Sequence, residues 1–250
     1  MSQAVPNLCL NLVPGGIVMT HSNEKTVGEL VAENPASARV FEKYGIDYCC
    51  AGKRSLDDVC RERGVARTAL LEELSQTGPQ PLPGARDWQN ASLRDLIEHI
   101  VSYHHAYLKS ELPRISDLFG RVMRAHSERE PVLIEVSEIF AILKEELDAH
   151  LMKEEMILFP TIGKLEAGGS AGAPCSIEHP IARMEYEHES AGRALAQMRH
   201  LTRDYYIPDE ACSTYRALFA TLVELESNLH EHIHLENNIL FPHAINLQTR

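Results

Sequence analysis

Two stretches decide the fold: HLMKEEMILFP at residues 150–160 and HIHLENNILFP at residues 232–242. When they are aligned, His, Glu, Ile, Leu, Phe and Pro fall at the same six places. On an α-helix a His and a Glu four residues apart lie one turn apart on the same face. The repeat therefore predicts a duplicated helical hairpin in which each copy carries one His–Glu pair.

The face that carries each pair is apolar. In the first copy the core rhythm includes Leu143, Leu147, His150, Glu154 and Ile157, and in the second copy it includes Leu225, Leu229, His232, Glu236 and Ile239. Because residues with this spacing share one side of a helix, both His–Glu pairs are expected to point into a protein core rather than into solvent.

The chain beyond residue 90 reads as four long amphipathic helices. We expect them at about residues 93–118, 132–159, 180–203 and 209–241, with a disturbance at Pro113 in the first. Four such helices with these connections form an antiparallel four-helix bundle, which makes the fold class all-α.

A small helical domain is expected before the bundle, at residues 24–78, with Thr26 and Ser55 in N-cap positions. Three prolines then mark a stiff linker at residues 79–90, and the bundle occupies residues 91–246. Residues 1–23 are expected to be a flexible extension, with Met19 as an alternative native start.

Composition narrows the class of partner. The net charge of −12 argues against nucleic acid as a partner. The sequence has no run of about 18 apolar residues, so no membrane span is expected. The N-terminus lacks the features of a secretory signal, so a cytoplasmic protein is expected. The six cysteines have irregular spacing, which does not resemble a secreted disulfide framework.

Buried carboxylates such as Glu154 and Glu236 cost several kcal/mol of hydration each unless a cation compensates them. Imidazole and carboxylate together suit iron or manganese, with zinc as an alternative. His188 also lies in core phase on the third helix. On the first helix the candidates are His104 and His105, and the apolar neighbours centre better on His104.

The segments YHHAY, HLMKEEMILFP, EYEHESAG and HIHLENNILFP resemble the hemerythrin-like di-iron bundles. With KYGIDYCCAGK before the bundle, the chain resembles one branch of them, the iron–sulfur cluster repair di-iron proteins or RIC family. The resemblance implies two iron ions with an oxo or hydroxo bridge and bridging glutamates. The ligands that it implies are His104, His150, Glu154, His188, His232 and Glu236.

The same resemblance implies repair of iron–sulfur clusters after nitrosative or oxidative damage, by supply of iron or electrons. The expected partners are damaged iron–sulfur proteins and small molecules such as nitric oxide, oxygen or peroxide, and a homodimer is one expectation for the assembly. Oxygen-carrying hemerythrins place a second histidine one turn after the third-helix ligand, where this chain has Gly192. The missing ligand predicts open coordination positions or labile iron. It also keeps open a nitric oxide or peroxide reductase, and a gas or redox sensor.

Cys49 and Cys50 are adjacent in a turn-like stretch close to Lys53 and Arg54. Cationic neighbours favour the thiolate form, which attacks electrophiles and binds metals. A disulfide between adjacent cysteines is strained and therefore labile. We interpret the pair as candidate redox or iron-relay thiols, with a purely structural role as the alternative.

Overall fold

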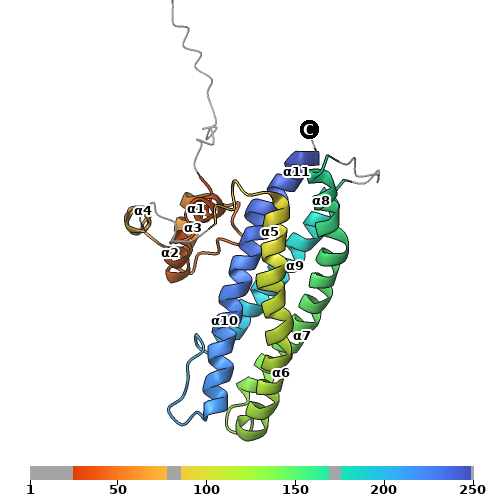
Figure 1. Ribbon diagram of the computed structural model, residues 1–250. Coiled ribbons are helices and arrows are strands. Elements are labelled where there is room, and N and C mark those ends of the chain that lie inside the picture. The colour runs from red at the N-terminus through yellow and green to blue at the C-terminus, as the bar shows by residue number, and fades with distance from the viewer. Residues whose placement is uncertain (1–24, 78–85, 169–175, 249–250) are drawn as a thin grey trace, which may run out of the picture.

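The computed structural model describes residues 25–77, 86–168 and 176–248, and regular structure in these ranges is helical apart from one isolated bridge between Thr26 and Ser55 (Figure 1). The prediction of an all-α protein with a small helical region before a long bundle is confirmed. The expected extension at residues 1–23 and most of the expected linker at residues 79–90 lie outside the described residues.

The small N-terminal region contains four short helices among the described residues, and the first and third of them have side-chain N-caps. The four helices are α1 (Val27–Glu33), α2 (Ser37–Lys43), α3 (Leu56–Arg63) and α4 (Arg67–Gln76). Thr26 caps α1 in a reciprocal capping box with Glu29, and Ser55 accepts a hydrogen bond from the Asp58 N–H at the start of α3. Both predicted N-caps are therefore confirmed.

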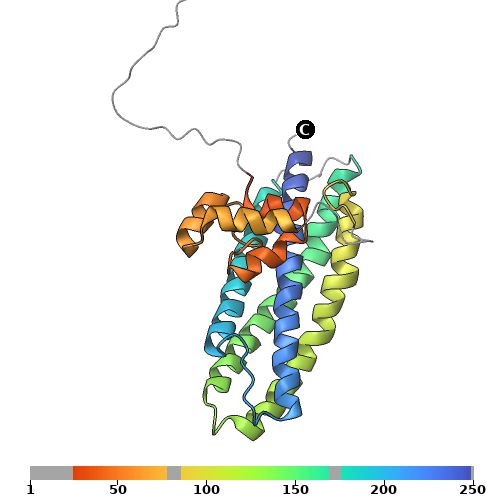
Figure 2. The same ribbon diagram turned by 90° about the vertical axis from the view of Figure 1, so that its left-hand side faces the viewer.

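Four long helical rods follow, and three of them are interrupted by a π-helical turn. The first is α5 (Leu93–His99), η1 (Ile100–His105) and α6 (Ala106–His126); the second is α7 (Val132–Lys153), η2 (Glu154–Leu158) and α8 (Phe159–Glu166); the third is α9 (Glu178–Leu201); the fourth is α10 (Ser213–Leu235), η3 (Glu236–Leu240) and α11 (Phe241–Gln248). Helix α6 packs against α10, and α7 packs against α9, as Figure 2 also shows.

A disturbance was expected at Pro113, but the helix is not interrupted there. Helix α6 continues through Pro113, with Leu112 and Ile115 fully buried on either side of it, so core packing holds the helix together there. The irregularity lies 8 to 13 residues before Pro113 (113 − 105 and 113 − 100), in the π-helical turn of η1.

A π-helical turn inserts one extra residue into the α-helical register and so rotates the following residues by one position. The effect is visible at η2. Ile157, which the α-helical rhythm places in the core, is 61% exposed, whereas Leu158 is 3% exposed. The expectation for Ile157 is therefore wrong, while Ile239 in the second copy is buried as expected.

The bundle core consists of two apolar clusters with a polar layer between them. One cluster includes Leu147, Ala191 and Leu229, and the other includes Leu158 and Leu240. The His and Glu side chains of the two repeats lie between these clusters along each rod. Their polar atoms are therefore shielded from water by apolar side chains above and below.

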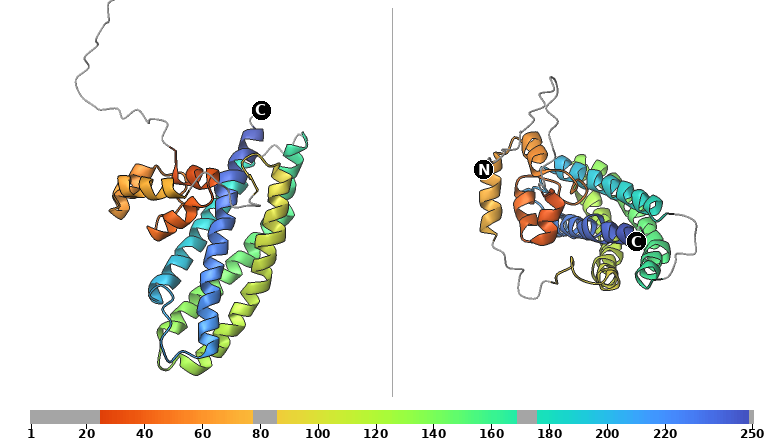
Figure 3. Two further views of the ribbon diagram at one scale, coloured as in Figure 1. Left: turned by 60° about the vertical axis from the view of Figure 1, so that its left-hand side comes forward. Right: turned by 90° about the horizontal axis from the view of Figure 1, so that it is seen from above.

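The small region docks on the C-terminal rod (Figure 3). Ile233 of α10 belongs to the small region's own apolar cluster. Asn238 donates hydrogen bonds to the carbonyl oxygens of Tyr48 and Cys49 at 3.3 and 3.1 Å. A Cβ atom at Gly28 or Gly52 would lie 2.3 Å from Asn238 Oδ1, so only glycine leaves room for this anchor.

Among the helices of the described ranges, none combines the length and the apolar character that crossing a bilayer requires.

Candidate metal centre

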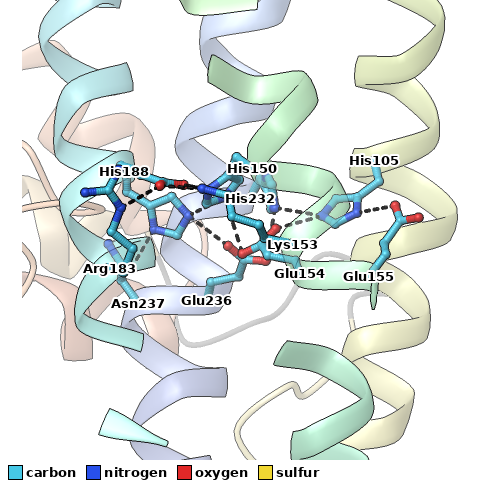
Figure 4. A network of polar contacts seen from close by, with 11 residues as sticks. His105, His150, Lys153, Glu154, Glu155, Arg183, His188, His232, Glu236 and Asn237 are labelled. Atoms are coloured by element: carbon cyan, nitrogen blue, oxygen red, sulfur yellow. Dashed lines mark hydrogen bonds and ion pairs between the residues drawn. The ribbon is translucent and has the colours of Figure 1, made fainter. Parts of the chain in front are cut away.

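Two groups of side chains converge in the polar layer (Figure 4). The first group, here named the 150/188 position, consists of His150 and His188 with Glu154 and Glu236; the second, the 105/232 position, consists of His105 and His232 with the same two glutamates. In each group one ligand atom per residue lies within 4.8 Å of all the others. All six side chains are buried.

The two glutamates lie between the two positions. Glu154 places Oε1 3.3 Å from His150 Nε2 and Oε2 3.4 Å from His105 Nε2. Glu236 places Oε2 3.1 Å from His188 Nε2 and Oε1 3.1 Å from His232 Nε2. Each carboxylate therefore presents one oxygen to each position, which is the arrangement that two bridging carboxylates require.

Three of the four imidazoles are held from behind by an oxygen acceptor at Nδ1. The contacts are His105 to Glu155 at 2.8 Å, His150 to Glu187 at 2.9 Å and His188 to Asn237 at 2.8 Å. An oxygen acceptor requires that Nδ1 carries the hydrogen, so a neutral imidazole then presents a lone pair at Nε2. The orientation of Asn237 follows from its Nδ2, which donates to the Cys49 carbonyl oxygen.

The Nε2 atoms face one another across each position. His150 and His188 are 3.1 Å apart at Nε2, and His105 and His232 are 3.2 Å apart. Facing lone pairs at this distance repel unless a proton or a cation lies between them. Two histidines and two shared carboxylates per position form a donor set that suits iron, manganese or zinc. The residues present therefore fit a pair of metal ions.

The protein groups alone already hold the carboxylates in their charged form. Burial by itself would raise the pKa of Glu236, but the imidazoles of His232 and His188 hold that pKa well below its usual range. Burial and Glu236 would raise the pKa of Glu154, yet the neighbouring imidazoles, above all His150, lower it. Both glutamates are thus ready to bind a cation at neutral pH.

Metal loading is expected to release a proton from His150. Burial would lower the pKa of His150, but the Glu154 carboxylate outweighs burial and raises this pKa to about 9. At about pH 7.5 the metal-free protein therefore holds a proton that a metal must displace, roughly one per filled 150/188 position. Calorimetric titration with Mn²⁺ in buffers of different ionisation enthalpy measures it.

The sign of the pH dependence follows from the raised pKa. The protonated His150 contributes stability to the metal-free protein fully below about pH 6.5, and this contribution is lost as the pH rises through about 9. The proton released on Mn²⁺ binding should decline over the same upper range. A release that stays constant from about pH 7 to pH 9.5 would contradict the assignment.

The structure brings together five of the six predicted ligand residues, but on the first rod it places His105 and not His104 in the centre. The η1 turn ends at His105 and shifts the register by one residue. An α-helical register continued from the buried Leu96 and Ile100 places His104 on the core face. The same register continued back from the buried Leu108 and Leu112 places His105 there instead. The structure therefore places His105 beside the two glutamates, where the sequence predicted His104.

His104 is buried beside the centre without entering it. Its ring stacks on that of His232, with 5.6 Å between the centroids and 11° between the planes. Its Nδ1 lies 3.3 Å from Asn228 Oδ1, and its Nε2 has no partner among the described residues. Burial lowers the pKa of His104 to about 3, so this imidazole is neutral.

The residues that hold the imidazoles from behind were not predicted. Glu155 and Asn237 occupy the same place in the two aligned repeats, and each accepts a hydrogen bond from a histidine of a neighbouring rod. The repeat alignment thus contained a signal for both. Glu187 directly precedes His188, and it is clamped by Lys153 and by Arg183, whose Nε lies 2.8 Å from Glu187 Oε1.

The double cysteine lies against the metal centre. Cys50 Sγ is 3.5 Å from the backbone oxygen of His188, and Cys49 Sγ is 3.8 Å from Cys50 Sγ. Asp47 Oδ1 accepts hydrogen bonds from the backbone N–H groups of Cys49 and Cys50 at 3.0 and 2.9 Å, and from the Cys49 thiol at 3.2 Å. The side chain of Asp47 therefore shapes the turn that carries both thiols.

The expectation of a cation-stabilised thiolate is wrong for Cys49. Lys53 pairs with Glu185 at 2.7 Å and Arg54 pairs with Glu62, so acidic partners engage both cations. The hydrogen bond with Cys50, burial and the Asp47 carboxylate together raise the pKa of Cys49 well above its ordinary value. Cys49 is therefore a thiol at neutral pH.

Gly192, which the resemblance predicts to mark an open coordination position, lies against the double-cysteine turn in the structure. A Cβ atom at this residue would lie 3.3 Å from Cys50 Sγ. The glycine thus leaves room for the double-cysteine turn to pack against α9 one turn after His188.

Comparisons with known proteins follow the same division of the chain. Residues 95–244 match the family described as the hemerythrin HHE cation binding domain, and residues 23–77 match a domain of unknown function (DUF542). The iron–sulfur cluster repair protein YtfE of Dickeya chrysanthemi (strain Ech1591) is 36% identical over 225 residues, covering 90% of this chain and 98% of the relative. YtfE of Enterobacter sp. (strain 638) is 36% identical over 222 residues, covering 89% and 97%.

The fold and the convergent His and Glu side chains define a hemerythrin-like cation-binding bundle with a docked double-cysteine domain. Within that class, the chain belongs to the family of YtfE-type iron–sulfur cluster repair proteins.

Proposed function

We propose that this protein holds two iron ions at the 150/188 and 105/232 positions and supplies iron to iron–sulfur clusters damaged by nitrosative or oxidative stress. The observation that carries the proposal is the placement of Glu154 and Glu236, each of which offers one oxygen to each position. Bound there, the iron pair would be both a redox-active centre and the source of the iron that is handed over.

The protein's own residues would compensate the charge of the two iron ions, hold them in position and exclude water from them. Glu154 and Glu236 would compensate the charge of the cations. Three of the four imidazoles, those of His105, His150 and His188, would bind through Nε2 because oxygen acceptors hold their Nδ1 atoms. The apolar clusters on both sides exclude water, which strengthens each of these electrostatic contacts.

The double cysteine is the proposed path between the centre and a damaged cluster. Cys50 lies 3.5 Å from the His188 backbone oxygen and is half-buried, whereas Cys49 is buried behind it. Thiolates bind ferrous iron, and Cys50, which is partly exposed while Cys49 is buried, is the better placed of the two to take an ion first. Damaged iron–sulfur proteins are the proposed partners.

Repair of a nitric-oxide-damaged iron–sulfur enzyme tests this function. The iron-loaded protein is expected to restore activity, whereas the Glu154→Leu, Glu236→Leu variant should restore little or none because it lacks both bridging groups. Glu145→Leu, Glu224→Leu is the matched control, since these glutamates lie on exposed faces of the same two rods. Equal recovery with both double variants would refute the proposal.

The sequence left open a nitric oxide or peroxide reductase, and a measurement of catalytic turnover distinguishes that function from iron donation. A reductase would consume nitric oxide or peroxide catalytically with an added reductant, whereas an iron donor reacts once per bound pair and leaves iron-depleted protein behind. Iron content after the repair reaction therefore distinguishes the two.

A further inference from the structure

The two metal positions are related by the internal repeat. The repeat pairs His150 with His232, and the helical hairpins pair His105 with His188. Each position therefore takes one histidine from each hairpin, and the 105/232 position is the image of the 150/188 position. Any difference between their surroundings is a departure from this symmetry.

Both histidines of the 150/188 position are fixed from behind. His150 donates from Nδ1 to Glu187 at 2.9 Å, and His188 donates to Asn237 at 2.8 Å. Glu187 is itself held by Lys153 and Arg183. A carboxylate behind an imidazole fixes the ring and raises its basicity, which strengthens metal binding.

The 105/232 position lacks half of this support. His105 donates to Glu155 at 2.8 Å, which repeats the contact of His188 with Asn237. His232 Nδ1, in contrast, has no hydrogen-bond partner among the described residues, although it is buried.

The missing partner has a definite location. Glu187 directly precedes His188, and the residue that directly precedes His105 is His104. His104 thus occupies the place of Glu187 in the image, and its ring lies over His232 at 5.6 Å. Its Nδ1 is directed to Asn228 instead of to His232.

We propose that the two metal positions differ in lability, that iron is surrendered from the 105/232 position first, and that His104 in the place of an acidic residue is the cause. The inference rests on the proposed function, and it specifies which of the two ions is the cargo. The step is ligand exchange without a change of oxidation state: Fe²⁺ leaves to an external ligand, and protons from solvent take its place on the imidazoles.

Release of Fe²⁺ from the anaerobically loaded full chain to a colorimetric ferrous chelator tests the proposal. The wild-type protein is expected to lose one ion in a fast phase and the other about 10- to 100-fold more slowly, which is the effect of one such outer partner. His104→Glu supplies the missing carboxylate and should slow the fast phase toward the slow one. His104→Leu, which supplies no acceptor, should leave the fast phase in place.

A reciprocal variant keeps the test decisive if His104→Glu fails to fold. Glu187→Leu removes the partner of His150 and should speed up the slow phase toward the fast one. Release of both ions in one phase from the wild-type protein, or an unchanged fast phase in folded His104→Glu, would overturn the inference. Cluster repair by a wild-type protein that releases both ions at one rate would leave the proposed function standing, whereas failure to hold two ions would end both.

Discussion

His105→Ala is expected to bind one metal ion per chain, whereas His104→Ala should still bind two. His105 places Nε2 3.2 Å from that of His232 and 3.4 Å from Glu154, while neither nitrogen of His104 reaches a carboxylate. Removal of His105 leaves the 105/232 position with a single imidazole. Equilibrium dialysis against Fe²⁺ under anaerobic conditions, followed by metal analysis, gives the stoichiometry directly.

Thermal unfolding provides a second measurement of the same prediction. A metal at a free concentration 100 times its dissociation constant stabilises the folded state by about 2.7 kcal/mol. The wild-type protein and His104→Ala should gain this from both positions, but His105→Ala from one only. One ion in His104→Ala and two in His105→Ala would mean that the helix follows an uninterrupted α-helical register in solution.

The shift of helical register at η1 explains which site residues could be predicted from the sequence and which could not. The repeat predicted the bundle. It also placed two His–Glu pairs in one layer, because residues four apart on a helix lie on the same face; these residues are His150, Glu154, His232 and Glu236. His105 was missed because a period of 3.6 residues cannot reveal a π-helical turn, and the apolar residues on the two sides of η1 give conflicting phases.

Some contacts around the candidate ligands could also be predicted from the sequence, and others could not. Glu155 and Asn237 stand at equivalent places in the repeat, so the alignment contained their role although their different chemistry obscured it. The contact of Cys50 with the segment around His188 and Gly192 could not be predicted. It joins residues far apart in the chain and depends on how the small domain docks, which no local pattern records.

Gly192→His is expected to dislodge the double-cysteine turn. A Cβ atom alone at residue 192 would lie 3.3 Å from Cys50 Sγ, so an imidazole needs space that the turn now fills. The hydrogen bonds of Asn237 and Asn238 to the carbonyl oxygen of Cys49 restrain the turn, so it cannot move far enough for an imidazole without losing them. Overpacking of this kind costs about 1–3 kcal/mol. Hydrogen exchange of residues 47–53 should therefore rise severalfold, while the protein still binds two metal ions.

Two further variants separate docking from coordination as the reason for this glycine. Gly192→Ala adds one carbon at a tight but tolerable distance and should have a small effect, and Cys50→Ala combined with Gly192→His should restore part of the protection because it removes the opposing sulfur. If Gly192→His instead left exchange unchanged and altered the optical spectrum of the Co²⁺-loaded protein, residue 192 would open onto the metal. The absence of a histidine at residue 192 would then affect metal coordination rather than docking. Cys50 would not pack in the space beside His188.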